Sequence, residues 1–249
     1  MINIVFDDLS KDILEFINNQ AFFIFKNQNI TRGIELWFRD KDHKTCLNIR
    51  FGDITFWNTS YVTSLSNLFF YKRYFNRLIL WDTRKVTSMT GMFKCAHRYN
   101  QPLNHLITSN VEEFQYMFQE ALTFNQKLNL FDTKKAKYLN HMFNKCVNFN
   151  QNINNWDVSN VVSINCMFMD TVNYNQPLDN WDVSSVISAS HVFKKALSFD
   201  SPINNWNLEK CDDISFIFNE AFNFNQPLDK WNTKNISNFN SAFKHAINF

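Results

Sequence analysis

Four aspartates each follow an aromatic residue directly, and 25 or 50 residues separate neighbours in this set: Asp82, Asp132, Asp157 and Asp182. If the chain winds so that they stack, their carboxylates could share a calcium ion, which prefers oxygen ligands. Asparagine holds the same place at Asn58, Asn207 and Asn232. Because a short Asp or Asn side chain can also cap a turn through its own backbone, we favour a turn and predict no metal site.

Other residue types that carry chemistry are scattered. The six histidines form no metal triad, and the sequence has no HExxH, no GxSxG and no glycine-rich phosphate loop. Five cysteines without a CxxC pair predict neither a disulfide framework nor a zinc site, and they favour a reducing compartment. We therefore predict no catalytic residue and no cofactor, and hence that the protein is not an enzyme.

An internal repeat organises most of the chain. Its copies begin 24 or 25 residues apart, at Trp57, Trp81, Leu106, Phe131, Trp156, Trp181, Trp206 and Trp231. We call these copies coils 1 to 8 and number coil positions from these residues. A unit of this length cannot bury its own aromatic residues, so stacked neighbours must complete the core.

Two coil positions predict ladders along such a stack. Position 13 is phenylalanine in every coil, at Phe69, Phe93, Phe118, Phe143, Phe168, Phe193, Phe218 and Phe243. Position 20 is asparagine except at Asp200, and includes Asn76, Asn100, Asn125, Asn150, Asn175 and Asn225. We predict a buried aromatic ladder, and an asparagine ladder that satisfies buried backbone groups rather than binding a polar ligand.

Positions 6, 9, 12, 13 and 16 of the coils are nearly always apolar or small, which is helical spacing. We therefore predict a short helix near positions 10 to 16, followed by a turn and a very short extended rung around position 23. Prolines at position 22 limit the length of that rung. The predicted fold class is a right-handed, leucine-rich-repeat-like α/β repeat solenoid of eight coils.

The chain before the repeat predicts a different unit. Residues 1–52 contain helical patterns at 7–17 and 30–40, and we expect a mainly helical cap over the apolar edge of the first coil. Residues 53–249 then form the repeat solenoid as a single continuous domain.

The segments WNTSYVTSL, WDTRKVTSM, WDVSNVVSI and WDVSSVISA, together with the recurring MF pair and FNQPLDNWD, resemble the BspA-type bacterial surface protein repeat. That repeat occurs in Listeria and Mycoplasma surface proteins and in giant viruses. The resemblance covers about residues 52–249 and implies a leucine-rich-repeat-like solenoid used for adhesion or protein binding. The N-terminus departs from secreted members because it has no secretory signal pattern. We expect a cytoplasmic or host-cell intracellular protein, or a virion component.

The charge pattern constrains the partners. A net charge of +2 disfavours nucleic acid, and no apolar run is long enough for a membrane span. Lysines recur just after the MF pair, at Lys94, Lys145, Lys194, Lys195 and Lys244. This row is typical of a solvated face, with an acidic protein partner as the alternative.

These patterns leave three functional hypotheses. The leading one is a non-catalytic protein–protein interaction module whose partner is unknown. The second is a structural component of a larger assembly such as a virion, with self-association through an uncapped C-terminal coil. The third reads FDDLSKDILEFI as an F-box-like start and predicts a ubiquitin ligase adaptor.

Overall fold

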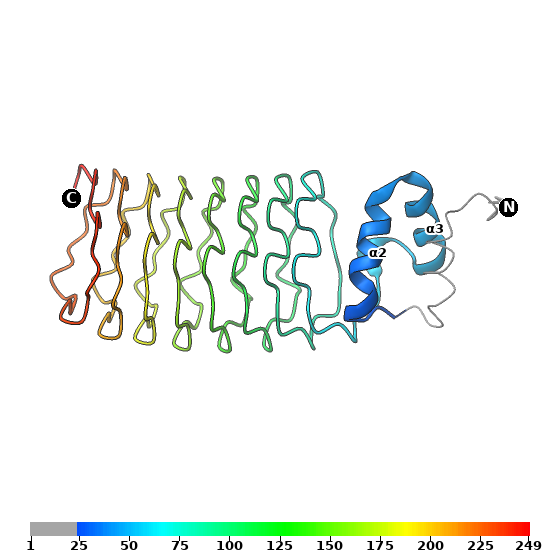
Figure 1. The fold of residues 1–249 in the computed structure, drawn as a ribbon, viewed down its shortest axis with the longest axis horizontal. Coiled ribbons are helices and arrows are strands. Elements are labelled where there is room, and N and C mark those ends of the chain that lie inside the picture. Colours follow the sequence, from blue (N-terminus) through cyan, green and yellow to red (C-terminus); the bar gives the residue numbers. More distant parts are fainter. Residues whose placement is uncertain (1–23) are drawn as a thin grey trace.

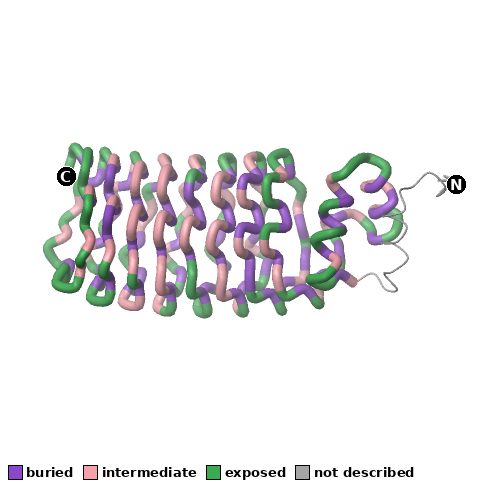
Figure 2. The backbone as a smooth tube through the Cα atoms, in the orientation of Figure 1, coloured by how far each residue is buried: buried purple, intermediate pink, exposed green. Residues whose placement is uncertain are grey.

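The computed structural model describes residues 24–249 as a row of stacked coils with a helical segment at one end (Figure 1). The helical segment consists of α2 (Asn27–Arg39), α3 (Lys41–Phe51) and the short 3-10 helix η2 (Ile54–Phe56). Coils 1 to 8 follow. Buried residues recur in every coil, so the core runs the length of the stack, and the last coil is the most exposed (Figure 2).

The two α-helices lie against the first coil. α2 buries Ile30, Ile34 and Trp37, which share one helix face. The ring of Trp37 lies 6.3 Å from that of Phe75, a residue of coil 1. Neither α2 nor α3 has the length and apolar character that a membrane-crossing helix needs, and these are the α-helices of the described chain. The helix predicted at 7–17 and the F-box-like segment lie outside the described residues.

The predicted α/β class is wrong. Between residues 57 and 249 the structure has no helix and no strand, and the α-helices all precede the coils. The β-structure between neighbouring coils of residues 57–249 is limited to single-residue parallel bridges at position 8, through Ser64, Ser88, Glu113, Tyr138, Ser163, Ser188, Asp213 and Asn238. The predicted short helices are absent, and the inter-coil bridge lies at position 8 rather than near position 23.

Successive tight turns replace the predicted helix. Positions 11 and 15 are left-handed in every coil, with φ between 52° and 63°. In coil 5 these residues are Cys166 and Asp170, and each is the third residue of a turn closed by an i to i+3 hydrogen bond. A right-handed helix cannot contain such residues without a large steric cost.

The turns also direct backbone hydrogen bonds out of the coil. Amide N–H groups at positions 9, 11, 13 and 15 donate to carbonyl oxygens at positions 8, 10, 12 and 14 of the next coil. The Phe168 amide, for example, donates to the Val192 carbonyl at 3.0 Å. The helical periodicity was misleading because these turns bury positions 9, 12, 13 and 16 with the same spacing that a helix would use.

Glycine substitutions at two adjacent lysines distinguish the turns from a helix. Lys195 has φ 57°, whereas Lys194 is not left-handed. Lys195→Gly is expected to stabilise the protein by about 1 kcal/mol because glycine removes the left-handed cost. Lys194→Gly should instead destabilise it by about 1 kcal/mol. Urea unfolding midpoints measure both values, and a loss of stability in both variants would contradict the turn geometry.

Candidate functional site

The phenylalanines at position 13 form one continuous stack. Ring centroids of adjacent coils lie 5.4 to 5.8 Å apart along the whole series. Each ring also stacks on the aromatic residue at position 19 of its own coil, as Phe168 does on Tyr174 at 4.3 Å. All are fully buried except Phe243, which is 37% exposed in the last coil. From coil 1 to coil 7 these rings build the core and leave no surface for a ligand.

The asparagines at position 20 bind the next coil. The Oδ1 atom of Asn150 accepts hydrogen bonds from the backbone N–H of Asn175 and from Nε2 of Gln176, both at 3.0 Å. Asn76, Asn100 and Asn125 accept the same pair of bonds from their following coils. The carboxylate of Asp200 does so for Asn225 and Gln226. From Asn76 to Asp200 the acceptor atoms of this ladder are therefore used by the fold.

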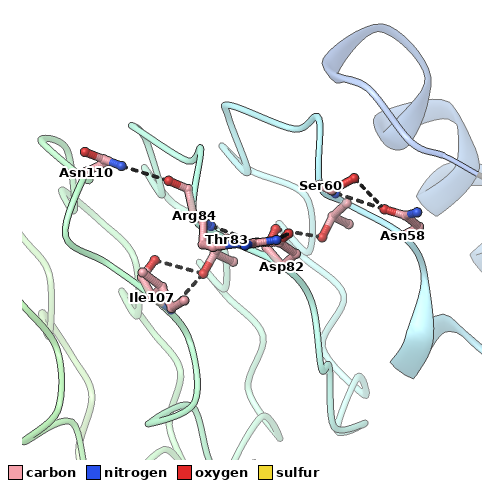
Figure 3. Close-up of polar contacts among 8 residues, drawn as sticks. Asn58, Ser60, Asp82, Thr83, Arg84, Ile107 and Asn110 are labelled. Atoms are coloured by element: carbon pink, nitrogen blue, oxygen red, sulfur yellow. Dashed lines mark hydrogen bonds and ion pairs between the residues drawn. The ribbon is translucent and has the colours of Figure 1, made fainter.

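The aspartates that could have held calcium are turn residues. Asp82 accepts a bond from the backbone N–H of Arg84 at 3.1 Å, and Asn58 accepts the equivalent bond from Ser60 at 3.1 Å (Figure 3). The Arg84 guanidinium also donates to Asp82 and holds the pKa of this carboxyl below its ordinary value. Residues 24–249 contain no cluster of three His, Cys, Asp or Glu suited to a metal ion.

The predicted lysine row lies at positions 14 and 15 of coils 2, 4, 6 and 8. In coils 3, 5 and 7 position 15 is acidic, at Glu120, Asp170 and Glu220. Lys145 pairs with Glu120 at 3.3 Å and Lys195 with Glu220 at 3.8 Å. Lys94 and Lys194 instead lie over aromatic rings, and the Lys244 ammonium forms no ion pair within residues 24–249. The row therefore alternates in charge along the stack.

Buried thiols and half-buried imidazoles complete the reactive side chains. The cysteines are free, and burial raises the pKa of Cys146 far above its ordinary value. His141 and His191 stack on Tyr116 and Phe216 at 4.7 and 4.6 Å. Desolvation lowers the pKa of both imidazoles. Thiols that are this poorly ionised are weak nucleophiles.

A pocket of about 470 Å³ lies where the helices meet coil 1. We call it the first-coil pocket; it is lined by Trp37, Phe38 and Lys44 from the helices and by residues 71–77 from coil 1. The Lys44 ammonium lies 4.2 Å from the Trp37 ring centre, and the Lys72 ammonium 4.8 Å from that of Phe38. Tyr71 and Tyr74 are 55% and 78% exposed.

The first-coil pocket is rich in unpaired positive charge. Arg77 pairs with Asp53 at 2.6 Å. Lys44, Lys72 and Arg73 form no ion pair within residues 24–249. Cationic groups beside exposed aromatic rings can bind anionic and aromatic groups of a partner.

The family model that matches the chain is described as Mycoplasma protein of unknown function, DUF285. It matches residues 38–156 and again residues 137–249. The protein belongs to this family. Together the two matches take in the end of α2, all of α3 and the coils. The comparison with curated proteins finds no match.

The sequence patterns of this DUF285 protein did not predict the first-coil pocket, although coil 1 contains basic residues that depart from the repeat. Position 16 is alanine, cysteine or threonine in coils 2 to 8 but Lys72 in coil 1. Position 21 is glutamine or serine elsewhere but Arg77 here, and position 17 carries Arg73. Coil 1 therefore has three cations at positions where the other coils have different residue types. These cations line a pocket only because α2 and α3 pack against coil 1.

Proposed function

We propose that this DUF285 protein is a non-catalytic protein–protein interaction module. The observation that carries the proposal is a difference between the repeated and the variable positions of each coil. The repeated phenylalanines, asparagines and aspartates are bound to neighbouring coils or to their own turns. Positions 4 and 5, which are exposed or half-buried in every coil, differ from coil to coil and are available to recognise a partner.

The nature of the partner follows from charge and family likeness. The protein is nearly neutral overall, with a net charge of +2, so a nucleic acid partner is disfavoured. The resemblance to the BspA-type surface protein repeat also supports binding rather than chemistry. Five free thiols support a reducing, intracellular setting, either cytoplasmic or in a host cell infected by a giant virus.

An affinity pull-down of the tagged full-length protein from its source cells tests the proposal. We expect one dominant foreign protein, identified by mass spectrometry, that then binds the purified protein with 1:1 stoichiometry in calorimetry. Recovery of nucleic acid alone, or of a ubiquitin ligase subunit as the dominant partner, would contradict it.

The last coil favours a second candidate, a structural component of a larger assembly. Phe239, Ile247 and Phe249 are 67%, 73% and 53% exposed. A pocket of about 370 Å³ lies beside Phe239 and Phe243. Exposed apolar clusters of this kind can bury against a second subunit. Sedimentation velocity between low and high micromolar concentrations distinguishes the candidates, since self-association favours the assembly and a constant monomer excludes it.

A further inference from the structure

We infer that the first-coil pocket binds an acidic peptide segment that carries an aromatic or large apolar residue. This inference rests on the proposed interaction function and identifies where it acts and on what. The aromatic rings of Trp37 and Phe75 line the pocket and give it an apolar floor, and these two residues are only 6% and 3% exposed. Its walls carry the ammonium groups of Lys44 and Lys72 and the guanidinium of Arg73. An apolar floor with a cationic rim fits an apolar anchor flanked by carboxylates.

The fold does not require these cations. Coils 2 to 8 form the same turns with small residues at position 16, and Ala96, Ala121 and Ala196 are fully buried there. The Lys72 ammonium instead lies over Phe38 of α2, outside the core of the coil. Arg73 takes the place of Leu122 and Leu197 in sister coils. Because the other coils fold without these basic residues, Lys72 and Arg73 are available to bind a partner.

The cations keep their charge available to a partner. Asp53 neutralises Arg77, but Lys44, Lys72 and Arg73 have no carboxylate partner in the described part of the chain. Just outside the pocket, the Arg98 guanidinium lies 5.0 Å from the ring centre of the exposed Tyr74 and extends the positive rim. The carboxylates of a ligand can therefore pair with these three cations.

A peptide fits this pocket better than a polynucleotide does. Nucleic acid binding needs basic groups along an extended track of phosphates. Here Lys44, Lys72 and Arg73 cluster around one pocket, whereas the row at positions 14 and 15 alternates between lysine and acidic residues further along the stack. A short acidic segment matches the length of the basic surface.

Fluorescence anisotropy with the full-length protein and the labelled peptide Glu-Glu-Phe-Glu-Glu tests the inference. We expect saturable binding that weakens as salt rises. Replacing the peptide's phenylalanine by serine, or its glutamates by lysines, should weaken binding by about tenfold or more. Equal binding of the lysine peptide, or no binding of the acidic one at millimolar concentration, would overturn the inference.

The double variant Lys72→Ala, Arg73→Leu places residues of sister coils at both positions and should keep the unfolding midpoint. We expect its affinity for the acidic peptide to fall by about tenfold. Lys44→Ala removes a cation from the opposite wall and should act in the same direction. The matched control Lys210→Ala, Lys230→Ala loses the same charge at two exposed lysines of coil 7 and should bind like the wild type.

Two results would overturn the assignment of the pocket. One is unchanged peptide affinity in both the double variant and Lys44→Ala. The other is tight binding of single-stranded DNA that both variants abolish, which would make the partner a nucleic acid. A protein partner from the pull-down that still binds both variants would leave the interaction function intact and remove only this pocket.

Discussion

Replacing Phe168 by alanine is expected to destabilise the protein by about 3–5 kcal/mol. The Phe168 ring is fully buried in coil 5, and its centroid lies 5.8 Å from that of Phe143 and 5.7 Å from that of Phe193. Removing it leaves a cavity that two neighbouring coils share. Because each coil is completed by the next, the loss should appear in the unfolding of the whole stack, measured by urea denaturation.

Phe222→Ala is the matched control for this prediction. It deletes the same side chain from coil 7, but Phe222 is 38% exposed at position 17 and lies outside the ladder. We expect its unfolding free energy to change by less than about 1 kcal/mol. A similar loss in both variants would show that the position 13 stack is not the principal source of stability.

Replacing Asn150 by alanine is expected to cost about 2 kcal/mol, the second largest effect. Asn150 Oδ1 accepts from the Asn175 backbone and the Gln176 side chain, and alanine leaves both donors without their acceptor. Coil 6 supports the view that the oxygen acceptor provides the stability, because Asp200 accepts the same two hydrogen bonds there.

Asn150→Asp is therefore the control, because it keeps Oδ1 and should change the unfolding free energy by less than about 0.5 kcal/mol. Thermal unfolding monitored by circular dichroism measures both variants. If the aspartate variant were as unstable as the alanine variant, the asparagine amide group rather than its oxygen would be the stabilising element.

The repeat and its buried positions could be predicted from the sequence, but the class of backbone could not. The spacing of Ile164, Met167, Phe168 and Thr171 is the same for a helix and for consecutive turns. What separates them is the left-handed residue at positions 11 and 15. Gly91 and Asn67 at position 11 are residue types that favour this conformation.

Bulky residues hid that signal in other coils. Tyr116 and Phe216 adopt φ values of 62° and 57° at position 11, where such residues are rare. Their amides gain hydrogen bonds to the next coil, and their rings stack on His141 and His191. Tertiary contacts between coils therefore override the local preference, and no single coil contains them.

The candidate site could also be predicted only in part from the sequence. The asparagine and aspartate patterns could be interpreted within the repeat, since Asp and Asn exchange at one coil position only if they share a backbone role. The first-coil pocket could not, because Trp37 and Lys44 lie more than 25 residues before Lys72 and meet it only through the packing of α2 and α3 on coil 1.

The most direct test of the interaction account is site-specific photo-crosslinking from the first-coil pocket in source cells. A benzophenone amino acid replaces Tyr74, which is 78% exposed at the pocket, and in a control protein it replaces Tyr138, which is 39% exposed in coil 4. The account predicts that position 74 crosslinks to an acidic segment of one foreign protein, that the Lys72→Ala, Arg73→Leu background abolishes this product, and that position 138 does not form it. Identical products from both positions, or crosslinks at position 74 that persist without Lys72 and Arg73, would contradict it.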